Sequence, residues 1–211
     1  MYQLTIADHH PIVKEGLQHI LSDDDFIISN VVVDGKDLNA SLEKTVPDLL
    51  ILELDLPNLQ GLSSIKALRR KFAGIKILIF SQHPEEMYAL SAIKAGAMGY
   101  VGKLAPIKTV RTAIMQVNKG GIYLNTELSS MLAKNENSSN NIAYRYKRLS
   151  SRETEVLNML SSGKRNKDIA QSLDINEKTV STYKTRLLRK LDAGSLAELI
   201  QQARLLQTSD L

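Results

Sequence analysis

Residues 49–57 read Leu-Leu-Ile-Leu-Glu-Leu-Asp-Leu-Pro. Apart from Glu53, residues 49–54 are an unbroken apolar run and are predicted to form a strand, and Pro57 begins a loop. Continuous apolar strands are typical of parallel sheets that are buried on both faces. Similar β-type runs lie at residues 3–7, 26–33, 76–81 and 99–103. Helical periodicity follows each of these runs, at residues 11–21, 38–45, 62–72, 85–95 and 107–119. This alternation predicts an open parallel sheet with helices on both faces over residues 1–122.

The excess positive charge of the chain lies in its C-terminal third. The 211 residues carry 27 Lys and Arg against 23 Asp and Glu, a net charge of +4. Residues 1–134 hold 14 basic and 14 acidic side chains, whereas residues 135–211 hold 13 basic and 9 acidic ones. A neutral module followed by a basic one indicates that the second module binds a polyanion. The absence of Cys excludes disulfides, thiolate metal sites and a Cys nucleophile.

The apolar segments of the chain are too short for a membrane protein. The longest runs, such as residues 49–52 and 77–80, are far below the length of a membrane span. No basic segment followed by a long apolar stretch stands at the N-terminus, so no signal peptide is recognisable. We therefore expect a cytoplasmic protein without a membrane partner.

The segment after the predicted sheet domain has a different organisation. Residues 135–141 are all polar and give the clearest linker signal. The linker is predicted for residues 123–146, and its first part is expected to be tied to the sheet domain. Short helices are then predicted at residues 151–161, 166–173, 177–191 and 196–206. Two short helices joined by a tight turn form a helix-turn-helix, whose second helix lies in the major groove of DNA.

The helix predicted for residues 177–191 has one apolar and one basic face. The span from Lys178 to Lys190 contains five basic residues and no acidic one. Cations contact phosphates and small hydroxyls let a helix approach base edges, although a basic helix face is often merely solvated. The inward apolar stripe consists of Val180, Leu187, Leu188 and Leu191, with Tyr183 on or beside it. The candidate DNA-contacting residues are Lys178, Thr179, Ser181, Thr182, Lys184, Thr185, Arg186 and Arg189.

Residues 147–206 match a known pattern of motifs at fixed spacing. The matching motifs are Leu149-Ser-Ser-Arg-Glu-Thr-Glu-Val-Leu157, Gly163, Asn166-Lys-Asp-Ile-Ala170, Leu173, Lys178-Thr-Val180 and Lys190-Leu191. They resemble the LuxR-type DNA-binding domain, and with its N-terminal pattern the chain resembles a NarL/FixJ-type response regulator, especially the branch that includes BvgA and EvgA. In this family the positions that match Ser181, Thr182, Lys184 and Thr185 face the DNA groove.

The resemblance implies a complete domain organisation. It implies a flavodoxin-like, doubly wound receiver domain at residues 1–122 and an all-α, four-helix LuxR-type helix-turn-helix domain at residues 147–211. The function implied is that of a DNA-binding transcriptional regulator of a two-component system. Its implied partners are double-stranded DNA, a second copy of the chain in a homodimer, and a sensor kinase.

The N-terminal site departs from the pattern that the resemblance implies. Receivers of this family phosphorylate an Asp after the third strand and hold Mg²⁺ with it and two acids after the first strand. A hydroxyl and a Lys then grip the phosphoryl oxygens. Here Glu53 holds the phosphoacceptor position, and His9 follows Asp8 where a second acid is usual. The switch positions match at Ser81, Tyr100 and Lys103.

Two consequences follow from charge and length. His9 removes one carboxylate from the cation site, so we expect weak Mg²⁺ binding and no cofactor. Glu53 is one methylene longer than Asp, which brings its carboxylate within reach of Lys103 as a constant mimic of the phosphorylated state. The alternative is an inactive pocket that only holds the fold together. A third possibility is a phosphorylated regulator that uses Asp55, which lies past the strand end, as its acceptor.

Other interpretations of these residues are weaker. His9 and His10 stand next to each other, but no third ligand at a suitable spacing is apparent, so no metal site is expected and His10 is interpreted as structural. A flavodoxin-like phosphatase would use Asp8, Glu53 and Lys103, yet no Gly-rich loop carries a nucleophile, so we do not expect an enzyme. A protein-interaction adaptor would have lost DNA contact, against which the basic helix argues.

The last predicted helix carries more apolar residues than a domain of about 60 residues needs to bury. Part of this stripe is therefore a candidate dimer surface, and core packing is the alternative. The residues of the stripe are Leu196, Leu199, Ile200, Ala203 and Leu206.

Overall fold

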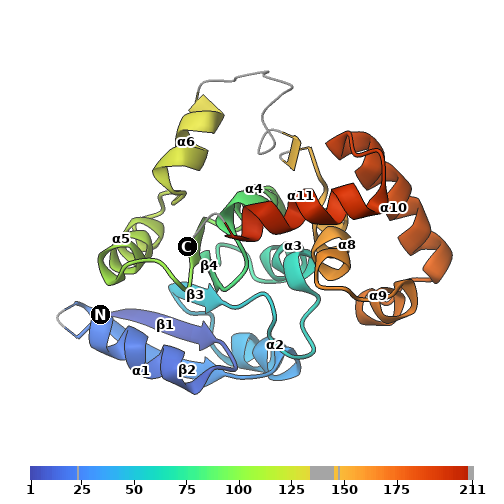
Figure 1. The fold of residues 1–211 in the computed structure, drawn as a ribbon. Helices are drawn as coiled ribbons and strands as arrows, with labels where there is room; N and C mark the ends of the chain where they lie inside the picture. Colours follow the sequence, from blue (N-terminus) through green and yellow to red (C-terminus); the bar gives the residue numbers. More distant parts are fainter. Residues whose placement is uncertain (23, 134–144, 147, 209–211) are drawn as a thin grey trace.

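The computed structural model describes residues 1–22, 24–133, 145–146 and 148–208, which form two domains (Figure 1). The predicted fold class is confirmed, because a five-stranded parallel sheet flanked by helices precedes a helical domain. The strands are β1 (Tyr2–Ala7), β2 (Phe26–Val32), β3 (Leu49–Leu52), β4 (Ile77–Ser81) and β5 (Gly99–Gly102). The first six helices are α1 (Pro11–Ile20), α2 (Gly35–Lys44), α3 (Gly61–Lys71), α4 (Glu85–Ala95), α5 (Ile107–Asn118) and α6 (Thr126–Ala133). The helices of the second domain are α8 (Ser151–Ser161), α9 (Asn166–Leu173), α10 (Glu177–Leu191) and α11 (Leu196–Thr208).

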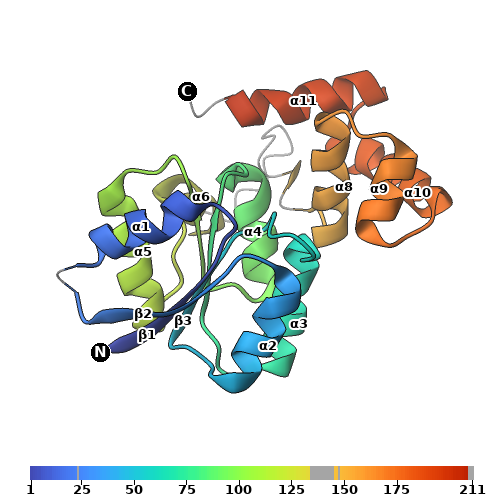
Figure 2. The ribbon, with the colours of Figure 1, turned by 90° about the horizontal axis from the view of Figure 1, so that it is seen from below.

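The sheet brings the carboxyl ends of four strands together. Its strand order is β2-β1-β3-β4-β5, and every neighbouring pair is parallel. Helices α1 and α5 cover one face, whereas α2, α3 and α4 cover the other (Figure 2). All of β3 is buried because it lies in the middle of the sheet between these helix layers. Polar side chains that follow β1, β3, β4 and β5 therefore meet at one end of the domain.

Two element bounds differ from the prediction in ways that concern the site. β3 ends at Leu52, so Glu53 lies just beyond the strand, although its backbone N–H still donates to Ala7 O at 2.9 Å. Helix α2 begins at Gly35, three residues earlier than predicted. The reason is that the Asp34 side chain accepts a hydrogen bond of 2.8 Å from Lys36 N and caps the helix.

The range predicted as a linker begins with ordered structure. Tyr123 extends the sheet beside β5, since its N–H donates to Met98 O at 2.8 Å and its carbonyl accepts from Tyr100 N at 3.3 Å. Asn125 then caps α6 by accepting a hydrogen bond of 2.9 Å from Leu128 N. The polar segment at residues 135–141 lies outside the described residues.

Helix bounds in the second domain follow strong local signals. α8, α9 and α10 have the predicted bounds, and α11 extends to Thr208. Ser150 and Glu153 form a capping box at the start of α8, and Asn176 caps α10 by accepting from Thr179 N at 2.8 Å. Between α9 and α10, Asp174 adopts a left-handed conformation with φ 52°, which makes the connection tight.

The two domains share one apolar core. Helix α8 packs against α3 and α4 of the sheet domain, and the buried residues on that side of the sheet join those of the second domain in one cluster (Figures 1 and 2). The buried residues on the α1 and α5 side form a separate cluster. Within the second domain, Leu199 and Ala203 of α11 are fully buried against α8 and α10. Ile200 and Leu196 are only partly buried, and the side chain of Leu206 lies outside the described residues. The inner part of the α11 stripe is therefore core.

Candidate functional site

The charged residues that follow the strands meet at the carboxyl end of the sheet. Asp8 follows β1, Glu53 follows β3, Ser81 ends β4 and Lys103 follows β5. Asp8 is 3% exposed, and Glu53 and Ser81 are fully buried. A buried charge is costly unless it is paired, so the partners of each carboxylate decide what this pocket can do.

Lys103 supplies the positive charge for both carboxylates. Its Nζ lies 2.6 Å from Glu53 Oε2 and 2.7 Å from Asp8 Oδ2. The other oxygen of Glu53 accepts hydrogen bonds from Ser81 Oγ at 2.6 Å and from Asp55 N at 3.2 Å. Both oxygens of the Glu53 carboxylate are therefore engaged by the pocket itself.

The histidines after β1 lie next to this ion-pair cluster. His10 Nδ1 is 2.8 Å from Asp8 Oδ1 and 2.9 Å from Lys103 Nζ, so His10 belongs to the pocket. The His9 ring packs against the His10 ring with centroids 4.0 Å apart. The sequence spacing indicated no third ligand beside the two histidines. The structure differs, because Asp8, His9 and His10 bring one ligand atom each within 4.8 Å of one another.

The Mg²⁺ ion that the fold family implies does not fit these residues. Mg²⁺ would have to compete with the Lys103 ammonium, which lies 2.7 Å from Asp8 and 2.6 Å from Glu53, for both carboxylates. His9 provides nitrogen where a hard cation such as Mg²⁺ prefers carboxylate oxygen. The positive charge at this end of the sheet is thus supplied by the Lys103 side chain of the protein itself.

Tyr100, the third residue at a predicted switch position, lies just outside the cluster. Tyr100 is fully buried, and its hydroxyl donates to His83 O at 2.9 Å. Burial raises the pKa of Tyr100 well above its ordinary value, so the hydroxyl stays a donor. His83 N in turn donates to Ser81 Oγ at 3.3 Å. Tyr100 therefore reaches the pocket through the backbone of His83.

Asp55 is paired with His83 and, among the described residues, forms no ion pair with Lys103. Its Oδ1 lies 2.9 Å from His83 Nε2, and its side chain is 47% exposed. Burial by itself raises the pKa of Asp55, but the hydrogen bond and charge of His83 outweigh this and lower it. The carboxylate that the sequence offered as a second phosphoacceptor is therefore held by His83 and is not part of the Lys103 ion-pair cluster.

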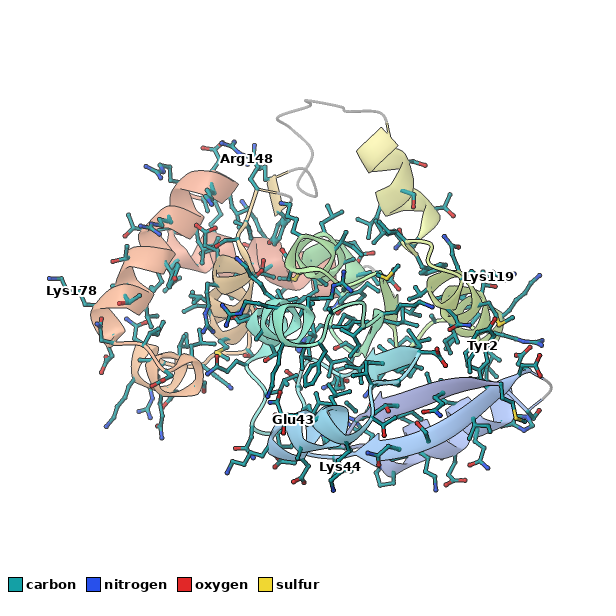
Figure 3. All side chains as sticks on the ribbon, turned by 180° about the vertical axis from the view of Figure 1, so that it is seen from behind. Tyr2, Glu43, Lys44, Lys119, Arg148 and Lys178 are labelled. Atoms are coloured by element: carbon teal, nitrogen blue, oxygen red, sulfur yellow. The ribbon has the colours of Figure 1, made fainter. Side chains whose placement is uncertain are left out.

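The candidate DNA-contacting residues occupy the outer face of α10. Arg186 stacks its guanidinium 5.9 Å from the centre of the Tyr183 ring, which orients it along this face. Figure 3 shows Lys178 at the outer tip of the helix, at the opposite end of the molecule from Lys119 and Tyr2. Six of the candidates are exposed, namely Lys178, Ser181, Thr182, Thr185, Arg186 and Arg189.

The other two candidates are partly buried and have partners. The Thr179 hydroxyl donates to the capping oxygen of Asn176 at 2.9 Å, so this residue secures the start of the helix. Lys184 Nζ donates to Asn166 Oδ1 at 3.4 Å, and Asn166 Nδ2 lies 3.4 Å from Ser181 Oγ. Sequence reasoning missed Asn166, although its place at the start of the first helix of the predicted helix-turn-helix was a usable signal.

Lys190, the one basic residue of the span that is not a candidate DNA contact, has a structural role. Its Nζ lies 2.6 Å from Glu153 Oε2 and 3.1 Å from Arg148 O. Burial raises the pKa of Glu153, but the Lys190 contact and the capping hydrogen bonds lower it overall. One of the five basic residues between Lys178 and Lys190 therefore ties α10 to the start of α8.

The contact between the domains contains polar groups that the sequence did not indicate. Ser91 of α4 and Thr154 of α8 place their hydroxyl oxygens 3.2 Å apart. Glu155 of α8 is 6% exposed and lies at the start of α3, where a Cβ on Gly61 would meet its Oε1 at 2.8 Å. Burial raises the pKa of Glu155, and the nearby Arg152 opposes that shift without cancelling it.

Comparisons with known proteins cover both domains. The family described as "Response regulator receiver domain" matches residues 4–115, and the family described as "Bacterial regulatory proteins, luxR family" matches residues 147–203. The oxygen regulatory protein NreC of Staphylococcus haemolyticus is 33% identical over 208 residues, which cover 95% of this chain and 96% of NreC. BvgA of Bordetella pertussis is 34% identical over 203 residues, which cover 96% of each chain.

A solved structure gives the same picture of the fold. RcsB from Salmonella enterica serovar Typhimurium, bound to promoter rprA, aligns with a TM-score of 0.78 at 23% identity. The alignment covers 96% of this chain and 98% of the RcsB chain. Among the described residues, no helix combines the length and the apolar composition that a membrane crossing requires.

Proposed function

Because the chain belongs to the response regulators that join a receiver domain to a LuxR-family DNA-binding domain, we propose that this transcriptional regulator binds DNA without prior phosphorylation. In this proposal Glu53 takes the place of a phosphorylated aspartate. The basic face of α10 contacts double-stranded DNA, and two copies of the chain bind paired half-sites as a homodimer. The protein acts in the cytoplasm as a regulator and not as an enzyme.

One observation carries the proposal for the receiver. The Glu53 carboxylate lies 2.6 Å from Lys103 Nζ and accepts a hydrogen bond of 2.6 Å from Ser81 Oγ. A lysine cation and a hydroxyl donor are the groups that hold the oxygens of a phosphoryl group in a receiver. Here they already hold an anion that the chain supplies, so the contacts that read negative charge are made permanently.

The pocket also lacks a carboxylate that is free to accept a phosphoryl group. Asp8 is paired with Lys103 at 2.7 Å, and Asp55 is paired with His83 at 2.9 Å. Attack by either carboxylate would first have to break these contacts with Lys103 or His83. We therefore expect a sensor kinase, the partner implied by the resemblance, to leave DNA binding unchanged.

DNA binding and dimerisation have separate support. RcsB has been solved bound to a promoter and as "two RcsB dimers bound to two parallel DNAs". In this chain, Lys178, Arg186 and Arg189 are exposed on one face of α10, where cations contact phosphates or base edges. The partly buried Leu196 and Ile200 of α11 are the residues available to a second copy.

Glu53→Gln tests the proposal, since it keeps the size of the side chain and removes its charge. We expect DNA affinity, measured by fluorescence anisotropy on a genomic fragment obtained by mapping bound DNA, to fall about tenfold. Dimerisation, measured by sedimentation, should weaken with it. Glu43→Gln is the matched control, because Glu43 is an exposed glutamate on α2. Unchanged DNA binding by Glu53→Gln would identify the receiver as inert.

Phosphorylation experiments test whether any carboxylate of the chain can accept a phosphoryl group. Incubation of the unaltered chain with Mg²⁺ and a small phosphodonor should leave its intact mass unchanged. The double substitution Glu53→Asp with His9→Asp restores the pattern of the family and should restore labelling that depends on Mg²⁺. A phosphoryl group on Asp8 or Asp55 of the unaltered chain would overturn the proposal.

A further inference from the structure

Three successive residues after β1 combine two imidazoles and one carboxylate. We propose that Asp8, His9 and His10 bind a late first-row divalent transition ion, with Zn²⁺ as the representative case, and that the ion displaces the Lys103 ammonium from Asp8. The proposed binding site depends only on these three ligand residues. Its effect as an input to DNA binding rests on the function proposed above.

The geometry brings the three donors together. One ligand atom from each of Asp8, His9 and His10 lies within 4.8 Å of the others. Asp8 is held in place, because its Oδ1 accepts a hydrogen bond of 2.9 Å from His10 N. The His10 side chain is 37% exposed, which leaves the site open to an ion from solvent.

His9 contributes a nitrogen that the described residues leave without a hydrogen bond. Its Nδ1 is buried and has no partner among them. A buried polar atom without a partner costs free energy, and a bound ion would use its lone pair. Members of the family usually carry an acid at this position. In this chain His9 therefore replaces an oxygen ligand with a nitrogen ligand.

His10 is placed between two groups that make opposite demands. Its Nδ1 lies 2.8 Å from a carboxylate oxygen of Asp8 and 2.9 Å from the ammonium of Lys103. One ring nitrogen donates to the first or accepts from the second, but it cannot do both. A divalent ion removes this conflict, because it accepts an electron pair from the carboxylate and from the imidazole alike.

The donor set selects the class of ion. Imidazole nitrogen suits Zn²⁺, Co²⁺ and Ni²⁺, whereas Mg²⁺ takes oxygen ligands in an octahedron. Three protein ligands leave a coordination position for water, as in open zinc sites. Because the ion carries two positive charges, it repels the Lys103 ammonium, which lies 2.7 Å from Asp8. Lys103 retains Glu53 as its partner, so the ion strengthens the pair on which the proposed function depends.

Zn²⁺ binding to the untagged full-length chain tests the proposal. Calorimetric titration without DNA should show one ion per chain, and Co²⁺ should give the absorption bands of a nitrogen-ligated ion. His9→Gln should weaken Zn²⁺ binding about 100-fold, the scale of effect expected when a metal site loses an essential residue. The matched control is His19→Gln, since His19 is an exposed histidine on α1, and it should bind Zn²⁺ like the parent.

Two further variants keep the test decisive. If circular dichroism shows that His9→Gln does not fold, His10→Gln takes its place with the same expected loss. Lys103→Met should bind Zn²⁺ about tenfold more tightly, because the competing ammonium is gone. Absence of Zn²⁺ binding in the parent, or equal binding by the parent and the folded His9 or His10 variant, would overturn the proposal. Since these titrations contain no DNA, their outcome is independent of the Glu53→Gln result.

Discussion

The receiver pocket and the outer face of α10 treat charge in opposite ways. In the pocket, Lys103 lies 2.6 and 2.7 Å from two carboxylates that are almost without exposure. On α10, Lys178, Arg186 and Arg189 are exposed, and none of the ion pairs within the described residues involves them. Charges paired inside the chain hold its own conformation, whereas exposed charges remain available to a partner. This contrast supports the proposal that the pocket holds the conformation of the receiver and that the outer face of α10 contacts DNA.

The largest effect is expected when the Lys103 ion pairs of the receiver pocket are broken. Lys103→Met leaves the buried Asp8 and Glu53 without their cation, and such a loss costs about 3–5 kcal/mol of unfolding free energy. Urea denaturation at neutral pH measures this cost. Lys108→Met, at an exposed lysine of α5, should change stability by less than about 0.5 kcal/mol. Equal stability of the two variants would show that the pocket charges do not hold the conformation.

An intermediate effect, on DNA binding, is expected from substitution of the exposed cations of α10. Arg186→Ala should weaken specific DNA binding by about 1–3 kcal/mol if the guanidinium contacts a base, and should reduce the salt dependence if it contacts a phosphate. Binding is measured at about 150 mM salt, where distant surface charges are largely screened. Lys119→Ala removes the same charge at the far end of the receiver and is the control. Undiminished specific binding by a Lys184 and Arg186 double substitution would contradict the groove assignment.

The smallest effect concerns a buried charge that the structure only partly compensates. Burial raises the pKa of Glu155 above its ordinary value of 4.5, so the folded state with its domains in contact favours the protonated carboxyl. This stabilisation is present below pH 4.5 and is lost as the pH rises through the raised pKa.

Glu155→Gln should therefore be more stable than the parent at neutral pH, by about 1 kcal/mol or less. The difference should shrink as the pH falls toward about 5, which urea denaturation across this range measures. Glu15→Gln, at an exposed glutamate of α1, should follow the parent at each pH. A stability difference that grows on acidification would mean that Glu155 stabilises the fold as a carboxylate.

The helices of the second domain show how far local sequence signals reach. α8 and α10 begin where predicted, because Ser150 with Glu153 and Asn176 supply caps that operate within a few residues. α2 begins earlier than predicted, because the side chain of Asp34 allows Gly35 to enter the helix. β3 ends earlier than predicted, because ladder pairing and not apolar character sets the end of a strand.

The candidate site was predictable as a set of residues and not as a set of bonds. Asp8, Glu53, Ser81 and Lys103 follow parallel strands, so their meeting at one end of the sheet was expected. Sequence reasoning missed His10 as a partner of Lys103 and the link from Asp55 to His83. Lys190, which is not among the candidate DNA-contacting residues, forms an ion pair with Glu153 that the sequence did not indicate.

The fold class, the two domains and the identity of the residues at each site follow from the amino-acid order alone. Periodicity, caps and motif spacing are local properties, and parallel strands bring their ends together whatever the side chains do. Packing of the folded chain settled which carboxylates Lys103 contacts, which cations of α10 stay exposed and that Glu155 is buried against α3. These choices depend on distances of a few ångströms between residues far apart in the chain. Such distances are set when helices and strands pack, and no local pattern in the sequence encodes them.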